Sequence, residues 1–432
     1  MRRSGLCKLM LIATVMSLLI VSLAACGGEE TTTTAAPTVT TAAPSTETTA
    51  APSTETTAGS PATAEPIKIG VLLDLTGFLA WTGTDNQKGM ELCVEMAGGQ
   101  VAGRPIQLVI EDAATDGAVA MDKAKKLVET DKVCIVLGPV NGMGDLAITG
   151  YMEEKGLPRI ELAPTEEVVA GGGYKWNFMP HGCGMMYGFA VADYAYKDLG
   201  YRSLAGLGAD MDAGKTFLGG FLTAFRNLGG TVPYETYYAP GTTDFLPFFA
   251  SMPKVDAVAT WWPGTDGLSG FPQYQESGLK YPMIQPEDGG LTADPKALKD
   301  LPSAAGCVAG TLYTYLLNTP GNVDFVKAYE AKQGMKPGVF AGCGYASMQY
   351  VLAALEAAGG DTTPAALQAA LKGVSVDTIC GPVSFPVPEN NIAAGRIVIM
   401  KVSEQLEPET IKTVRVQEAH DAAGKPVLTI VK

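Results

Sequence analysis

The segment Ala209-Asp210-Met211-Asp212-Ala213-Gly214-Lys215-Thr216 has the residue types of a loose phosphate-binding loop, between an expected strand and an expected helix. In such loops a lysine and backbone N–H groups bind phosphate, and the hydroxyl binds Mg²⁺. Here Asp210 and Asp212 would repel phosphate groups. In addition, no neighbouring strand offers an obvious acidic side chain beside the loop that could bind magnesium. We therefore interpret the segment as an ordinary strand-to-helix loop whose Lys215 faces solvent.

Side chains for catalysis are scarce in this chain. The only histidines are His181 and His420, and the sequence contains no Gly-x-Ser-x-Gly elbow, which argues against a serine hydrolase or a zinc hydrolase. We expect His181 to serve packing or hinge support and His420 to be solvated. The prediction is therefore a protein that is not an enzyme and that carries no metal or other cofactor.

Six cysteines follow the N-terminal region, and they lack the short paired spacings of a zinc site. Disulfides and buried thiols are both compatible with the pattern, so no pairing is assigned. These cysteines are Cys93, Cys134, Cys183, Cys307, Cys343 and Cys380.

The N-terminus has the pattern of an export signal. Arg2, Arg3 and Lys8 precede an apolar run of about 17 residues, which is short for a membrane span of roughly 20. The run ends Leu23-Ala24-Ala25-Cys26-Gly27, which resembles a bacterial lipobox. That resemblance implies cleavage after residues 1–25 and lipidation of Cys26, which would anchor the protein to the outer face of the cell membrane.

Residues 26–65 contain the lipidated Cys26 and a low-complexity stretch of Thr, Ala, Pro, Ser and Glu, in which Ala-Ala-Pro-Ser-Thr-Glu-Thr-Thr occurs at 42–49 and again at 50–57. Such a composition cannot bury a core, so we predict a disordered tether. Loss of the three positive charges of the signal would change the net charge from −14 to −17. This charge disfavours binding to nucleic acid or to anionic lipid.

The remaining chain, about 366 residues, is long enough for two domains. Continuous apolar runs such as 67–73, 204–208 and 257–260 alternate with helical patterns such as 86–97, 118–130 and 216–227. This alternation predicts an α/β fold with doubly wound parallel sheets in two lobes. We assign residues 66–182 and 314–380 to lobe 1, 183–313 and 381–402 to lobe 2, and 403–432 to a C-terminal tail that resembles a β-ribbon. The chain would then cross between the lobes several times, which makes a multi-strand hinge.

Over residues 66–402 the sequence resembles the branched-chain amino-acid type of periplasmic binding proteins, which have a type I binding fold and feed ABC importers. The order of many short segments carries this resemblance. They are Ile67-Lys68-Ile69-Gly70-Val71, Leu75-Thr76-Gly77, Gly83, Lys88-Gly89, Glu111-Asp112, Ala124 and Leu127, Val136-Leu137-Gly138-Pro139, Ala163-Pro164-Thr165, Asp210 with Gly214, Ser277-Gly278-Leu279, and Gly381-Pro382-Val383.

The resemblance and the physics of parallel sheets predict one binding site. Ligands of such sheets lie beyond the carboxyl ends of the strands, where helix N-termini also offer free N–H groups. Six loops fall there: 76–83, 138–143, 163–167, 210–214, 261–264 and 287–290. Trp81 and Trp262 would wall an apolar side chain, and Glu287 or Asp288 would meet an ammonium group. The predicted ligand-binding residues are Trp81, Asn141, Gly142, Ala163, Thr165, Asp212, Trp262 and Glu287.

The sequence departs from the family at three places. Gly142, preceded by Asn141, replaces a serine that often holds the ligand carboxylate; Ala213 replaces an aromatic; and Glu166 and Glu167 follow Pro164. These differences leave room for a larger or more cationic ligand than leucine. We expect an amino acid or related small polar solute, delivered to the permease subunits of an ABC importer. The alternative is a ligand-sensing receptor subunit of the same fold.

Overall fold

The structure, a computed structural model, describes residues 65–163, 174–288, 291, 298–387, 390–420 and 426–431. The predicted signal peptide and tether, with Cys26, and the predicted site residue Thr165 lie outside the described residues. Within these ranges, no helix combines the length and the hydropathy that a membrane span requires.

The first sheet has six strands in the order β2-β3-β1-β4-β5-β6, and all its neighbours except β2 and β3 are parallel. Its central strand β1 is buried because it is a continuous apolar run. Ile69 and Val71 belong to the core beside helix α1, and Leu72 belongs to the core beside α2 and α3. Helices therefore cover both faces. The elements are β1 (Ile67–Leu73), α1 (Ala80–Met96), β2 (Gln100–Val101), β3 (Arg104–Asp112), α2 (Gly117–Lys125), η1 (Lys126–Asp131), β4 (Val136–Leu137), α3 (Gly142–Lys155), β5 (Arg159–Ile160) and β6 (Asn177–Phe178).

The second sheet has eight strands in the order β16-β15-β14-β11-β10-β9-β7-β8. The strands from β8 to β11 run parallel, whereas β14, β15 and β16 extend the sheet as antiparallel strands from the end of the chain. The strands are β7 (Ser203–Ala209), β8 (Thr231–Tyr238), β9 (Ala257–Trp261), β10 (Met283–Gln285), β11 (Val308–Thr311), β14 (Gly395–Val402), β15 (Pro408–His420) and β16 (Pro426–Val431). The helical segments among them are α5 (Gly184–Asp193), η2 (Tyr194–Asp198), α6 (Asp212–Gly214), η3 (Lys215–Gly219), α7 (Gly220–Asn227), α8 (Leu246–Ala250), α9 (Asp266–Glu276) and η4 (Pro302–Ala304).

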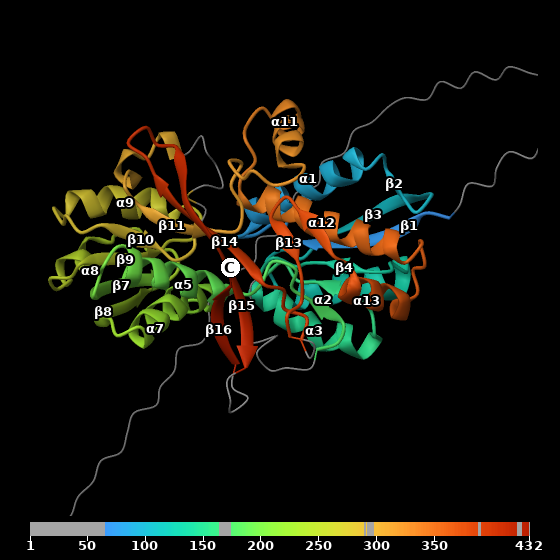
Figure 1. The fold of residues 1–432 in the computed structure, drawn as a ribbon, viewed down its shortest axis with the longest axis horizontal. Coiled ribbons are helices and arrows are strands. Elements are labelled where there is room, and N and C mark those ends of the chain that lie inside the picture. The colour runs from blue at the N-terminus through green and yellow to red at the C-terminus, as the bar shows by residue number, and fades with distance from the viewer. Residues whose placement is uncertain are drawn as a thin grey trace, which may run out of the picture. The chain divides into compact units, whose positions relative to one another are not determined.

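After the second parallel sheet the chain returns to the first one. Helix α12 packs along α1, and Figure 1 shows the two helices side by side in orange and blue. The chain then returns to the second sheet through β14. The elements of the returning segment are α11 (Asn322–Gln333), α12 (Val339–Ala357), α13 (Pro364–Gly373), β12 (Val376–Thr378) and β13 (Gly381–Val383).

Three segments thus join the elements of the two sheets, and two of them lie side by side. Met179 forms a parallel bridge with Ile392, its N–H donates to the Asn391 carbonyl, and the Ala393 N–H donates to the Met179 carbonyl. The third segment follows β11. Doubly wound parallel sheets with this connectivity confirm the predicted fold class.

Glycines allow α1 and α12 to approach closely. A Cβ atom on Gly89 would lie 2.1 Å from the backbone oxygen of Ala341, and one on Gly344 would lie 2.4 Å from the backbone oxygen of Asn86. Because real Cβ atoms do not approach backbone oxygens so closely, either substitution must push the helices apart.

We therefore expect Gly89→Ala to lower the free energy of unfolding by about 1–3 kcal/mol, the usual cost of forcing an extra methyl group into a packed core. The matched control is Gly150→Ala, since Gly150 lies in α3 and a Cβ atom there meets nothing within 4 Å. The control should gain up to about 1 kcal/mol from helix propensity. Urea titration of both variants tests this, and equal effects would contradict the close-contact explanation.

Candidate functional site

One cavity receives side chains from the ends of strands in both sheets. The loops after β1, β4 and β5 contribute from the first sheet, and those after β7, β9 and β10 contribute from the second. The cavity volume is about 140 Å³, and we call this space the aromatic cavity. It is lined by Leu79, Trp81, Thr82, Asn86, Val140, Glu161, Leu162, Ala163, Met179, His181, Gly182, Tyr187, Met211, Ala213, Phe217, Trp261, Pro263, Glu287, Leu312, Val339, Phe340 and Cys343.

The predicted site residues fall into three groups. Trp81, Ala163 and Glu287 line the aromatic cavity. Asn141, Gly142 and Asp212 line an adjoining cavity of about 560 Å³, which also contacts Ala163. The two cavities share six lining residues and therefore belong to one cleft: Leu79, Val140, Ala163, Met211, Ala213 and Phe217.

Trp262 does not line either cavity, which corrects the prediction for this residue. It is 1% exposed and packs edge-on against Phe271 with ring centroids 4.8 Å apart. Its neighbour Trp261 ends β9 and lines the aromatic cavity instead. Successive side chains of an extended chain point to opposite sides, so only one of two adjacent tryptophans can face the cavity. The sequence did not reveal which.

The secondary structure at Trp81 also differs from the prediction. It lies in the first turn of α1, which begins at Ala80, and not in a loop that extends to residue 83. Its ring meets Phe340 of α12 edge-to-face with centroids 5.0 Å apart. Two segments far apart in the sequence thus provide an aromatic corner of the cavity.

Glu287 is held by Trp261. The Trp261 Nε1–H donates to Glu287 Oε2 at 2.8 Å, and Glu287 is 8% exposed. Burial raises the pKa of Tyr187, another lining residue, well above its usual value, and the acidic groups of Cys343, Glu287 and Asp288 raise it further. This side of the cavity is therefore acidic as well as aromatic.

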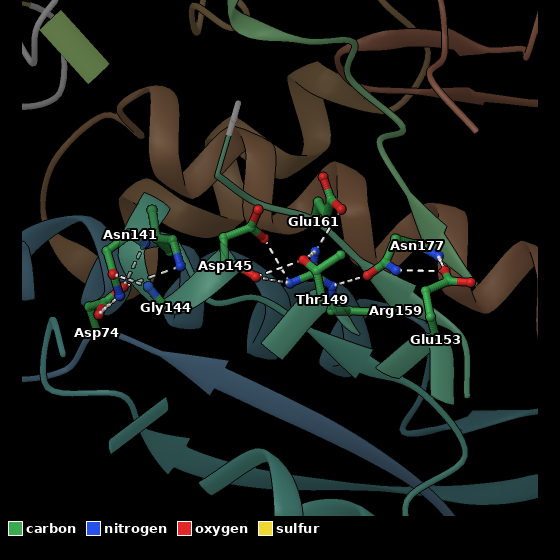
Figure 2. Close-up of polar contacts among 10 residues, drawn as sticks. Asp74, Asn141, Gly144, Asp145, Thr149, Glu153, Arg159, Glu161 and Asn177 are labelled. Atoms are coloured by element: carbon green, nitrogen blue, oxygen red, sulfur yellow. Dashed lines mark hydrogen bonds and ion pairs between the residues drawn. The ribbon is translucent and has the colours of Figure 1, made fainter. Parts of the chain in front are cut away.

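Asn141 has a structural role in the loop after β4. As Figure 2 shows, Asn141 and Asp74 point toward one another: Asn141 Nδ2 donates to Asp74 Oδ1 at 2.5 Å, and the Asn141 N–H donates to Oδ2 at 3.0 Å. Asn141 also caps α3, because its Oδ1 accepts from the Gly144 N–H at 2.6 Å. Burial raises the pKa of Asp74, and the hydrogen bond from the Asn141 side chain opposes that shift. The loop is thereby fixed at the cleft.

A buried charge cluster reaches the aromatic cavity through Glu161, and Figure 2 shows its contacts. Arg159 is fully buried, and its guanidinium lies 2.7 Å from Asp145 Oδ1 and 2.6 Å from Glu161 Oε1. It also donates to Asn177 Oδ1 at 2.5 Å and to Thr149 Oγ1 at 3.2 Å. We call Asp145, Arg159 and Glu161 the buried triad. Of its members, only Glu161 lines the aromatic cavity.

The chain matches the model of the family described as "Periplasmic binding protein" over residues 66–406. It belongs to the periplasmic binding proteins. The Leu/Ile/Val-binding protein of Escherichia coli K12 is 26% identical over 332 residues, which are 75% of this chain and 88% of that protein. These similarities place the chain in the branched-chain amino-acid type, as the sequence predicted.

Solved structures give the same family. An ABC transporter substrate-binding protein from Sphaerobacter thermophilus matches with a TM-score of 0.74 and 29% identity over 85% of this chain and 97% of that one. A solute-binding protein of an ABC transporter from Rhodopseudomonas palustris BisB5, in complex with 3,4-dihydroxybenzoic acid, matches with a TM-score of 0.71 and 26% identity over 78% and 93%. The periplasmic binding protein described here is thus a solute-binding protein of the ABC-transporter type, from a family that is extracytoplasmic and non-catalytic.

Several lining residues of this periplasmic binding protein were not predicted. Glu161 follows the two-residue strand β5, where an acid within an apolar segment was the available signal. Asn86 lies in α1, and Phe217 and Phe340 come from separate helical segments whose convergence the sequence does not show. His181 also lines the cavity; its Nε2 lies 2.9 Å from Ser347 Oγ, and burial lowers its pKa to about 4. His181 is therefore neutral near pH 7.

The part of the chain that the structure describes contains no metal site, and no lysine or arginine side chain lines the aromatic cavity there. No group of three or more His, Cys, Asp or Glu residues there is arranged to hold a metal ion. The described lining residues of the aromatic cavity include Glu161 and Glu287 but no lysine or arginine. Five of the cysteines carry free thiols: Cys93, Cys134, Cys307, Cys343 and Cys380.

Proposed function

We propose that this protein is the extracytoplasmic receptor of an ABC importer and that it captures an amino acid or a related small organic solute without chemical change. The observation that carries the proposal is that six loops, three from each sheet, line one apolar cavity with few polar groups. Ligand sites commonly have this composition, at the carboxyl ends of parallel strands. The relatives named for leucine, isoleucine and valine, or solved with an aromatic acid, support a solute of this size.

The connections between the sheets suggest how capture proceeds. Residues 66–182 with 314–380, and 183–313 with 381–402, would act as two lobes that close on the solute. The adjacent segments at Met179 and Ile392, with the segment after β11, would bend as the hinge. The closed form would then dock on the permease subunits, while Cys26 anchors the receptor to the membrane and the tether lets it move.

A screen tests the proposal. The mature chain with Cys26→Ser, which removes the lipid but keeps the tether, is mixed with amino acids, amines, amides and small carboxylates in a thermal-shift assay. A ligand that binds the folded state raises the melting temperature by mass action. We expect hits within this set, whereas stabilisation by nucleotides alone would contradict the assignment.

Glu287 is the proposed partner of an amino group on the solute. Since Glu287 is buried and bonded to Trp261, we expect Glu287→Gln to weaken an amine-bearing solute by about 2–3 kcal/mol, because the charge pair would be desolvated. Glutamine keeps an oxygen that accepts from Trp261. Isothermal titration measures the loss, and Glu276→Gln, at an exposed position of α9, is the control. Unchanged affinity in Glu287→Gln would remove this residue from the site.

A further inference from the structure

Two buried oxygen atoms of the aromatic cavity wall have no hydrogen-bond partner among the described residues. They are Glu161 Oε2 and Asn86 Oδ1. Glu161 is 4% exposed and Asn86 is 2% exposed, and both residues line the cavity. Buried acceptors without a donor are costly and uncommon in folded proteins. A ligand that brings N–H or O–H groups into the cavity would satisfy both.

The remaining polar groups of these two residues are already engaged. Glu161 Oε1 accepts from Arg159 Nη2 at 2.6 Å, and Asn86 Nδ2 donates to the Thr82 carbonyl at 3.0 Å. What each residue still offers is therefore an acceptor oxygen. Figure 2 shows the carboxyl group of Glu161 joined to Arg159 by a dashed line at the upper side of the charge cluster.

The charge balance around the cavity favours a positive ligand. Once Glu161 is ionised, Arg159 supplies one positive charge to the buried triad, whereas Asp145 and Glu161 supply two negative charges. Glu287 adds another acid to the cavity wall, and the described lining residues include no lysine or arginine. A cation would complete the neutralisation of the triad, but an anion would add repulsion in a poorly solvated place.

The apolar part of the wall fits the body of such a cation. Trp81 and Phe340 meet edge-to-face, and the ring of Trp261 lies within 26° of parallel to that of Phe217, with centroids 5.8 Å apart. The cavity volume of about 140 Å³ is close to that of apolar cavities that hold a benzene ring. Tryptophan faces also attract cations.

We propose that the solute of this protein is an organic cation, an apolar body of about one ring or one branched chain that carries an ammonium group. Glu161 Oε2 and Asn86 Oδ1 accept hydrogen bonds from N–H groups of that ammonium, and Glu287 contributes a further negative charge. The proposal rests on the proposed function, since it names the chemical class of the captured solute. It separates this protein from relatives that bind aromatic carboxylates or neutral amino acids.

Matched ligands test the charge preference. Isothermal titration of the mature Cys26→Ser chain compares 2-phenylethylamine with 3-phenylpropionate and L-phenylalanine, and isopentylamine with L-leucine. We expect the amines to bind at least about tenfold more tightly than the carboxylates of equal size. If the carboxylates or amino acids bind and the amines do not, this inference fails and the proposed function stands. If no member of the screened set binds, both fail.

Two variants test the acceptors. Glu161→Gln keeps an oxygen for Arg159 but replaces the carboxylate, so we expect at least about a tenfold loss of amine affinity and no loss for 3-phenylpropionate. Asn86→Leu removes the second acceptor, together with the Nδ2 donor to the Thr82 carbonyl, and should cost the amine about fivefold. Glu95→Gln, an exposed position of α1, is the control for net charge. If both variants melt like the parent and keep full amine affinity, the assignment is overturned.

The pH dependence gives a second readout. The pKa of Glu161 is raised to about 8; burial contributes most to this shift and the charge of Asp145 adds to it, while the charge and the hydrogen bond of Arg159 oppose it. Glu153 of α3 adds a smaller upward effect, while Glu287 and the neutral His181 stand elsewhere on the cavity wall. Below this pKa a proton competes with the ammonium for the carboxylate, so amine affinity should rise between about pH 6.5 and 8.5. Glu161→Gln should abolish that rise; a rise that persists in Glu161→Gln would overturn the role of this residue.

Discussion

Arg159→Met is expected to lower the free energy of unfolding by about 3–5 kcal/mol, the largest loss of stability that we predict for an exchange of one polar residue. The substitution removes the cation from the fully buried triad and leaves the carboxyl groups of Asp145 and Glu161 facing each other without it. It also removes the donors to Asn177 and Thr149. Chemical denaturation of the ligand-free protein measures the effect.

Two comparisons make this result specific to buried charge. Arg226→Met breaks an ion pair with Glu235 at a side chain that is 42% exposed, so the loss should stay below about 1 kcal/mol. Adding Asp145→Asn and Glu161→Gln to Arg159→Met should restore part of the stability, since no buried charge is then left uncompensated. If Arg159→Met lowers the free energy of unfolding as little as Arg226→Met does, the buried triad stabilises the protein no more than an exposed ion pair.

Trp261→Ala is expected to lower solute affinity by about a hundredfold. The side chain lines the aromatic cavity, stacks on Phe217 and holds Glu287 through Nε1. Its truncation therefore removes an apolar wall and also frees the carboxylate from its orientation. Aromatic anchors in desolvated sites commonly contribute effects of this size. Isothermal titration with the best solute of the screen measures the loss.

The neighbouring tryptophan provides the matched control. Trp262 packs against Phe245, Phe249 and Phe271 and does not line the cavity. Trp262→Ala should therefore lower the free energy of unfolding by about 3–5 kcal/mol through the void that it creates. Its solute affinity should change little at a temperature where the variant stays folded. The reverse pattern, with affinity lost in Trp262→Ala and kept in Trp261→Ala, would contradict the placement of the two rings.

The buried parallel strands were the most predictable elements. The apolar runs at residues 67–73 and 257–260 were predicted as strands; the first forms β1 with these bounds, and the second forms β9, which extends one residue further to Trp261. Their apolar runs identify them because a strand buried on both faces tolerates few polar residues. The helix predicted at residues 86–97 forms α1, which begins six residues earlier, at Ala80.

Elements whose stability depends on distant contacts were missed. Helix α9 contains Gly267, Gly270 and Pro272, residues that oppose helix formation. A Cβ atom on Gly270 would lie 2.6 Å from the ring of Trp262, so the glycine is required by packing and not by the helix itself. Strand β8 is an edge strand with a largely polar sequence, and it is recognisable only by its pairing with β7.

The sequence by itself determined the α/β class, the family and the six loops that hold the candidate site. Runs of apolar residues indicate buried strands, and the order of short segments along the chain indicates the loops. Only the tertiary structure decided which side chains reach the cavity. The orientation of one chain segment decides whether Trp261 or Trp262 faces the cavity. The roles of Glu161 and Asn86 depend on which of their oxygen atoms find a hydrogen-bond donor on neighbouring elements. Such contacts join residues far apart in the chain, so no local pattern encodes them.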